Sequence, residues 1–127
     1  GLLMHTINRY GEITEKRTDL SPEEEFLQVS VFRLNEGKTF KAHQHTECRK
    51  LANIAQESWV VVKGSVKVFL YDVDQTLLTE EVLNQGDCTI SFRGGHNYLC
   101  LEDDTVVYEY KTGPYYGQEL DKEFIDV

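Results

Sequence analysis

The sequence is poor in several features that define whole classes of protein. It has three cysteines without close spacing and no apolar run near the roughly 20 residues that a membrane-spanning helix needs. We therefore expect no membrane partner, and the odd, scattered cysteines fit a reducing compartment better than a disulfide scaffold. The first residues, Gly-Leu-Leu-Met-His-Thr, lack the basic start and long apolar stretch of a signal peptide, so the expected location is cytoplasmic.

Positive charge is also scarce. Thirteen lysines and arginines stand against 22 aspartates and glutamates, which gives a net charge of −9. An acidic surface repels the phosphate backbone, so we expect no nucleic-acid partner. A length of 127 residues, 40% of them hydrophobic, suits one globular domain. We expect that domain to span residues 1–127, with its core at about 26–112 and a C-terminal extension at 113–127.

Long helical periodicity is missing as well, because the hydrophobic pattern has mostly a period of two. Short segments with β-branched or alternating apolar residues follow one another between turns rich in Gly, Asn and Asp, which predicts an all-β sandwich or barrel. The predicted strands cover residues 27–34, 38–43, 59–62, 65–71, 76–83, 88–92, 96–101 and 105–111. The acidic run at 23–25 is expected in a solvated loop, with one helical turn at 21–24 as the alternative.

Histidine is rare, and two of the four histidines stand close together. His43 and His45 fall at the end of a predicted strand, where side chains two residues apart point to the same face. Two charged imidazoles at that distance repel each other, whereas a shared divalent metal ion binds both in their neutral form. The alternative is an ordinary polar surface strand. His5 stands alone near the N-terminus and is not expected to have a chemical role.

The residues around these histidines resemble the two signature motifs of the cupin superfamily. The first motif reads Gly37-Lys-Thr-Phe-Lys-Ala-His43-Gln-His45 and, after a spacer, Glu57-Ser-Trp-Val-Val-Val-Lys-Gly64. The second motif reads Gly86-Asp-Cys-Thr-Ile-Ser-Phe-Arg-Gly-Gly-His96. Together the two motifs cover roughly the middle half of the chain. The segment from Gln56-Glu57 to Asp121-Lys122 also resembles small bacterial single-domain cupins found with surface-polysaccharide or sugar-nucleotide genes.

One departure concerns the carboxylate of the first motif. The spacer at 46–56 is longer than the usual one, and Glu47, close after His45, is a competing carboxylate. We prefer Glu57 because its distance to Gly64 keeps the strand-and-turn register of the motif. An enlarged loop at the mouth of a barrel is also topologically cheap.

The resemblance implies both a fold and a metal site. A cupin is a double-stranded β-helix, a jelly-roll barrel, in which His43, His45, Glu57 and His96 would bind one divalent metal ion. Three neutral nitrogens and one carboxylate suit iron, manganese, nickel, cobalt or zinc. They also leave one or two coordination positions open to water or substrate, as a catalytic site requires. Because cupins commonly pair through outer strands, the resemblance also implies a homodimer.

Alternation places further candidates beside the expected site. Tyr98 shares a face with His96, which makes it a candidate proton donor or substrate contact, with a core tyrosine as the alternative. Lys111 is a candidate substrate contact, either as an inward ion pair with Glu109 or as half of a solvated rim pair. Arg49 lies in the enlarged loop. It would either steer an anionic ligand to the mouth of the barrel or be an ordinary surface arginine.

Two classes of function follow from this site. The first is a metal-dependent enzyme that acts on a small polar, carbohydrate-like molecule, as an isomerase, an epimerase or an oxygenase. In such an enzyme Tyr98 or Glu57 would move a proton near the metal ion. The second class is a non-catalytic module that binds a sugar or another small molecule.

Overall fold

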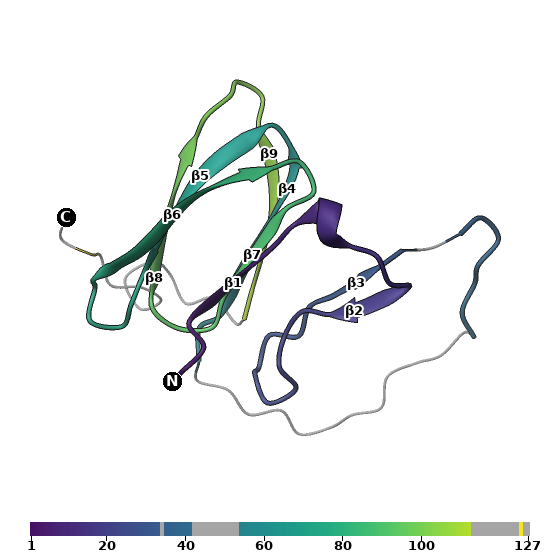
Figure 1. The fold of residues 1–127 in the computed structure, drawn as a ribbon, viewed down its shortest axis with the longest axis horizontal. Coiled ribbons are helices and arrows are strands. Elements are labelled where there is room, and N and C mark those ends of the chain that lie inside the picture. Colours follow the sequence, from purple (N-terminus) through teal and green to yellow (C-terminus); the bar gives the residue numbers. More distant parts are fainter. Residues whose placement is uncertain (34, 42–53, 113–124, 126–127) are drawn as a thin grey trace.

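The computed structural model describes residues 1–33, 35–41, 54–112 and 125, and in them the chain is all-β (Figure 1). The first strands are β1 (His5–Asn8), β2 (Arg17–Asp19) and β3 (Ser30–Phe32), with a short 3₁₀ turn, η1 (Tyr10–Glu12), after β1. The later strands are β4 (Glu57–Lys63), β5 (Ser65–Tyr71), β6 (Leu77–Asn84), β7 (Cys88–Ser91), β8 (Gly95–Cys100) and β9 (Val106–Lys111). In this part of the chain, no helix has the length and apolar character to cross a membrane.

Two antiparallel sheets face each other and enclose the core, in an arrangement of the β-sandwich type (Figure 1). The first sheet has the strand order β1-β7-β4-β9, and the second has the order β6-β5-β8. A separate pair, β2 and β3, lies beside the first sheet on the side away from the second sheet. The chain passes from the first sheet to the second through the β7–β8 turn, which carries Phe92, Arg93 and Gly94.

The strand register decides which side chains of the first sheet face the second, because directly opposed residues share a face. One row of polar residues crosses β1, β7, β4 and β9: His5, Ser91, Glu57 and Lys111. The next row on the same face consists of Ile7, Thr89, Trp59 and Glu109. The inward face of the first sheet therefore carries most of its polar groups at one end.

Apolar side chains fill much of the remaining space between the sheets. The buried cluster comes from β4, β5 and β6: Val61, Val66, Val68, Leu70 and Leu83. Ile7, Tyr98 and Val107 are partly buried and pack against it. Burying one large aliphatic side chain stabilises a protein by about 1.5–3 kcal/mol, so this cluster is the main source of stability.

The period-two pattern is confirmed for the second half of the chain, where the predicted strands coincide with β4 to β9 within two residues at each end. The first half differs. Within the described residues 27–33 of the predicted strand 27–34, only 30–32 form a strand, and 38–41 is not a strand; residues 34, 42 and 43 lie outside the described part. The sequence pattern also missed β1 and β2, which have four and three residues and little hydrophobic alternation.

Candidate functional site

Glu57 and His96 meet between the two sheets. Glu57 begins β4 in the first sheet, and His96 lies near the start of β8 in the second. The distance from Glu57 Oε2 to His96 Nε2 is 3.1 Å, and the two side chains are 21% and 25% exposed, so solvent reaches them. Two of the four metal ligands that the resemblance implies are therefore adjacent.

The other predicted site residues of the long loop lie outside the described residues: His43, His45, the competing Glu47, and Arg49. Within residues 1–33, 35–41, 54–112 and 125, no group of three or more His, Cys, Asp or Glu side chains could hold a metal ion. The described part of the site thus consists of one carboxylate, one imidazole and their neighbours.

Three groups hold the Glu57 carboxylate. Burial alone would raise its pKa, but hydrogen bonds with His96, Glu109 and Trp59 lower the pKa to about 2. The indole Nε1 of Trp59 donates to Glu57 Oε1 at 3.0 Å. The hydrogen bond to Glu57 raises the pKa of Glu109, and burial adds to that rise. Of the two carboxyl groups, Glu57 is therefore the one that ionises first and Glu109 the one that holds a proton more readily.

Lys111 lies on β9 directly opposite Glu57, and its charge acts on Glu109 by lowering the pKa of that carboxyl group. Both Lys111 and Glu109 are exposed as residues. The sequence analysis gave an inward ion pair and a solvated rim pair as alternatives. Both residues lie at a solvated rim, and this rim adjoins Glu57. Glu109 contacts the site through Glu57, and Lys111 lies at the same edge.

His96 has one ring nitrogen that is satisfied and one that is not. Nε2 faces Glu57, whereas Nδ1 is buried and has no hydrogen-bond partner among the described residues. An unsatisfied buried polar atom costs about 1–3 kcal/mol. Nδ1 and Nε2 point to different sides of the ring, so an ion shared with Glu57 would bind at Nε2 and would leave Nδ1 unchanged.

The chemistry of this pair fits a divalent metal ion. Two ligand atoms that each lie about 2.1 Å from one ion at right angles are about 3 Å apart. The separation of 3.1 Å between Glu57 Oε2 and His96 Nε2 is compatible with that value, and it is equally an ordinary hydrogen-bond length. An ionised carboxylate with an imidazole nitrogen and a second carboxyl group beside it is a donor set that suits a cation.

Tyr98 lies beside His96 on the same face of β8, with 5.5 Å between the ring centroids. Its ring stacks on Trp59 at a centroid distance of 3.7 Å and an interplanar angle of 1°. Its hydroxyl oxygen is 3.0 Å from Thr89 Oγ1, and burial raises the pKa of the phenol. Tyr98 is therefore both a neighbour of the site and a packed residue whose hydroxyl group already has a partner.

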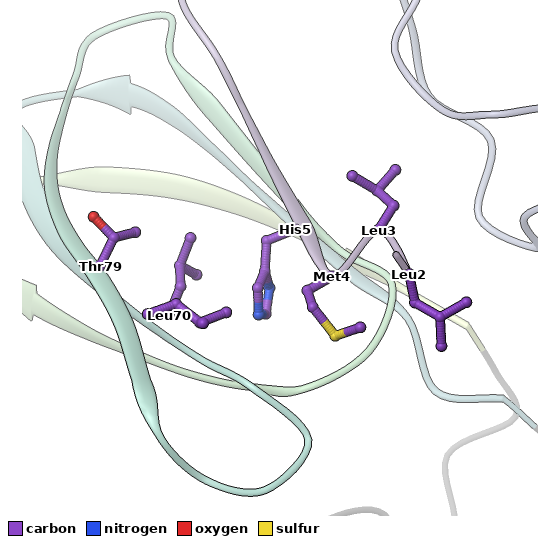
Figure 2. Close-up of a pocket in the computed structure, with 7 residues that line it drawn as sticks. Leu2, Leu3, Met4, His5, Leu70 and Thr79 are labelled. Carbon is purple, nitrogen blue, oxygen red and sulfur yellow. The ribbon is translucent and has the colours of Figure 1, made fainter.

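A cavity of about 220 Å³ adjoins the Trp59–Tyr98 stack. Its walls are Trp59, Val66, Tyr98, Cys100, Thr105 and Val107, and they do not include Glu57 or His96. A second cavity of about the same volume lies between β1 and the β5–β6 hairpin, where Figure 2 shows the imidazole of His5 between Leu70 and Met4. Both cavities have mainly apolar walls.

His5, which the sequence analysis set aside, is a structural connector at the polar end of the sandwich. Its Nδ1 is 2.9 Å from Ser91 Oγ, and its Nε2 is 2.9 Å from the carbonyl oxygen of Tyr71. A carbonyl group only accepts, so Nε2 carries the proton and Nδ1 accepts from Ser91. Burial lowers the pKa of His5, which keeps the ring neutral near pH 7. The bonds join β1, β7 and the end of β5.

Sequence reasoning also missed the contacts of Glu57 with Trp59 and Glu109. The first had a usable signal, since residues 57 and 59 are two apart on one strand and share a face. The second depends on the β4–β9 register, which the sequence does not reveal. Comparison of the chain with family models, with curated proteins and with solved structures finds no match.

Proposed function

We propose that this chain is a cupin-type, jelly-roll metal protein in which His43, His45, Glu57 and His96 bind one divalent metal ion. We further propose that it acts on a small polar, carbohydrate-like molecule. The observation that carries the proposal is the 3.1 Å contact between Glu57 Oε2 and His96 Nε2. It joins the two sequence motifs, and it joins the two sheets.

A simple buried ion pair is the competing explanation, and the surroundings of the pair argue against it. An ion pair is favourable inside a protein only when the remaining polar atoms are also satisfied. Here Glu109 adds a second carboxyl group beside Glu57. The two neighbouring carboxyl groups oppose each other's ionisation, as the raised pKa of Glu109 indicates, and a cation bound at Glu57 would relieve that repulsion.

The protein's own residues divide the remaining roles. A pKa of about 2 makes Glu57 a weak base, so we assign it to metal binding rather than to proton transfer. Glu109 has a raised pKa and lies beside Glu57, so it is the better candidate to give up a proton at the site. Tyr98 forms a wall and keeps its proton. A divalent ion, when bound, would polarise a carbonyl group or bind vicinal hydroxyl groups of a substrate.

Elemental analysis of protein purified without added metal tests the metal site. We expect about one metal ion per chain in the wild type and its loss in His96→Ala and Glu57→Gln. His5→Gln is the matched control, because His5 is also partly buried but both of its nitrogens have protein partners. The proposal is wrong if folded wild-type protein binds none of iron, manganese, nickel, cobalt or zinc, or if His96→Ala keeps its metal.

A second experiment separates the enzyme from the binding module. The metal-loaded protein is incubated with a panel of aldoses, ketoses and nucleotide sugars, and both product formation and ligand binding are measured. Turnover that is lost in Glu57→Gln supports the enzyme. Metal-dependent binding without turnover supports the non-catalytic module. Absence of both overturns the carbohydrate part of the proposal.

A further inference from the structure

Glu25 departs from the expectation for its acidic run at 23–25, since its side chain is only 13% exposed. Its two carboxylate oxygens accept hydrogen bonds from Arg93 Nη2 at 2.7 and 3.1 Å. One of these oxygens also accepts a bond from Gln56 Nε2 at 2.8 Å. A carboxylate from the segment between β2 and β3 is thus bound by two residues of the sandwich.

Gln56 is the first of these two partners, and it immediately precedes Glu57. It is 1% exposed, and its amide group is fully used. The backbone N–H of Leu27 donates to Gln56 Oε1 at 2.7 Å, which fixes the orientation of the amide and directs Nε2 toward Glu25. The backbone N–H of Gln56 donates to Thr112 Oγ1, and the N–H of Thr112 donates to the Gln56 carbonyl.

Arg93 is the second partner, and it lies three residues before His96 in the β7–β8 turn. Its guanidinium also donates to the carbonyl of Leu3, and its backbone N–H donates to the carbonyl of Met4. The next residue, Gly94, has a φ of 84° and closely approaches the Tyr71 carbonyl. Arg93 therefore anchors the β7–β8 turn, which, like the β4–β5 turn, takes the chain from the first sheet to the second.

We propose that Glu25, Gln56 and Arg93, here called the Glu25 cluster, are positioning residues for the candidate site. Gln56 sets the start of the strand that presents Glu57, and Arg93 sets the turn that presents His96. The single carboxylate of Glu25 binds both, so it fixes one presenting segment relative to the other. The functional importance of this positioning rests on the proposed function. The positioning itself is a property of the metal-free protein.

Charge gives the cluster its strength. Hydrogen bonds between ionised partners are shorter and about twice as strong as neutral ones. Removing the Glu25 charge leaves the guanidinium of Arg93, 28% exposed, without its anion. The β7–β8 turn then has a weaker connection to the β2–β3 segment, and we expect the geometry between His96 Nε2 and Glu57 to relax.

The test measures the ring ¹⁵N chemical shifts of the histidines in metal-free protein labelled with ¹⁵N-histidine. The chain has four histidines, so the spectrum is simple, and the His96 signals are assigned by their loss in His96→Ala. We expect Glu25→Gln to shift the ring nitrogens of His96 and to leave those of His5 in place. Glu24→Gln is the matched control, an exposed residue of the same acidic run, and should shift neither.

A folded Glu25→Gln variant with unshifted His96 signals overturns the inference, and so does an equal shift of His5 and His96, which would indicate general loosening. Arg93→Lys serves as the second variant, because it keeps the charge but loses the guanidinium that reaches both Glu25 and Leu3. If the wild type binds metal, Glu25→Gln should weaken its affinity about tenfold, as expected for a group that orients ligands. The ¹⁵N result stands whether or not metal binds, so the two proposals fail separately.

Discussion

Asp87 is a buried carboxylate that joins the β6–β7 turn to the segment after β1, and we expect its removal to destabilise the protein strongly. It is 5% exposed. Its Oδ1 accepts from the backbone N–H of Tyr10 at 3.0 Å. Its Oδ2 accepts from the backbone N–H of Asn84 at 2.9 Å and from Arg9 Nη1 at 3.0 Å.

The magnitude follows from the groups that Asp87→Ala leaves without an acceptor. Two backbone N–H groups, of Tyr10 and Asn84, each lose a hydrogen bond to a carboxylate, which is worth about 1.5–3 kcal/mol. Because both residues are otherwise exposed and water replaces part of each bond, the free energy of unfolding should fall by about 2–4 kcal/mol. Arg9 adds little, because its guanidinium keeps the carbonyl of Val82 as an acceptor. A loss of this size is a large part of the roughly 5–15 kcal/mol that stabilises a typical domain.

Urea unfolding at pH 7 measures the loss, with Asp103→Ala in an exposed turn as the control. Burial alone would raise the pKa of Asp87, but the bonds from Asn84, Tyr10 and Arg9 lower it below its ordinary value of 3.8. A lowered folded-state pKa gives stability that is present above pH 3.8 and is lost as the pH falls through the folded-state pKa. The free energy of unfolding of Asp87→Asn should therefore be lower than that of the wild type at pH 7 and approach the wild-type value in acid. A loss under about 0.5 kcal/mol in Asp87→Ala would refute the reasoning.

Two further substitutions examine the surroundings of the site. Gly94→Ala should lower the melting temperature, because φ is 84° and a Cβ would overlap the Tyr71 carbonyl oxygen. The left-handed backbone alone costs about 1–2 kcal/mol. An unchanged melting temperature would contradict the assigned turn. Tyr98→Phe should cost about 0.5–1.5 kcal/mol in urea unfolding, because it removes the bond to Thr89, while the metal content stays at the wild-type value. Loss of metal in Tyr98→Phe would instead place the phenol among the ligands.

Strands with a marked hydrophobic pattern could be predicted from the sequence, whether the partner is near, as for β5 and β6, or distant, as for β4 and β9. The short strands β1 and β2 have little pattern and could not be predicted. The β5–β6 hairpin could be located because β5 begins with alternating residues and residues 72–75 carry turn-forming side chains between the two strands. The four residues of β1 alternate only weakly, and they are extended because they pair with β7, more than 80 residues later. Short edge strands depend on such partners more than on their own propensity.

The same distinction applies to the site. The motif residues Glu57 and His96 could be singled out because their types and spacing match a known pattern. Glu25 could not, because a run of acidic residues is ordinarily solvated, and the arginine that buries it lies 68 residues further along the chain. Glu109 was found on the correct face, but its hydrogen bond to Glu57 depends on the β4–β9 register.

The distribution of polar groups inside the sandwich is itself an argument for a ligand. Buried polar groups are costly unless each finds a partner, and a core built for stability alone would be apolar throughout, as it is around Val61 and Leu83. At the other end, Ser91 and His5 satisfy each other, and Glu57 is held by three neighbours. Among the described residues, Ser58 Oγ and His96 Nδ1 are the buried side-chain atoms without a partner. The concentration of polar groups at this end, rather than any single unpartnered atom, distinguishes it from the apolar end, and it is why the metal-binding test is directed at Glu57 and His96.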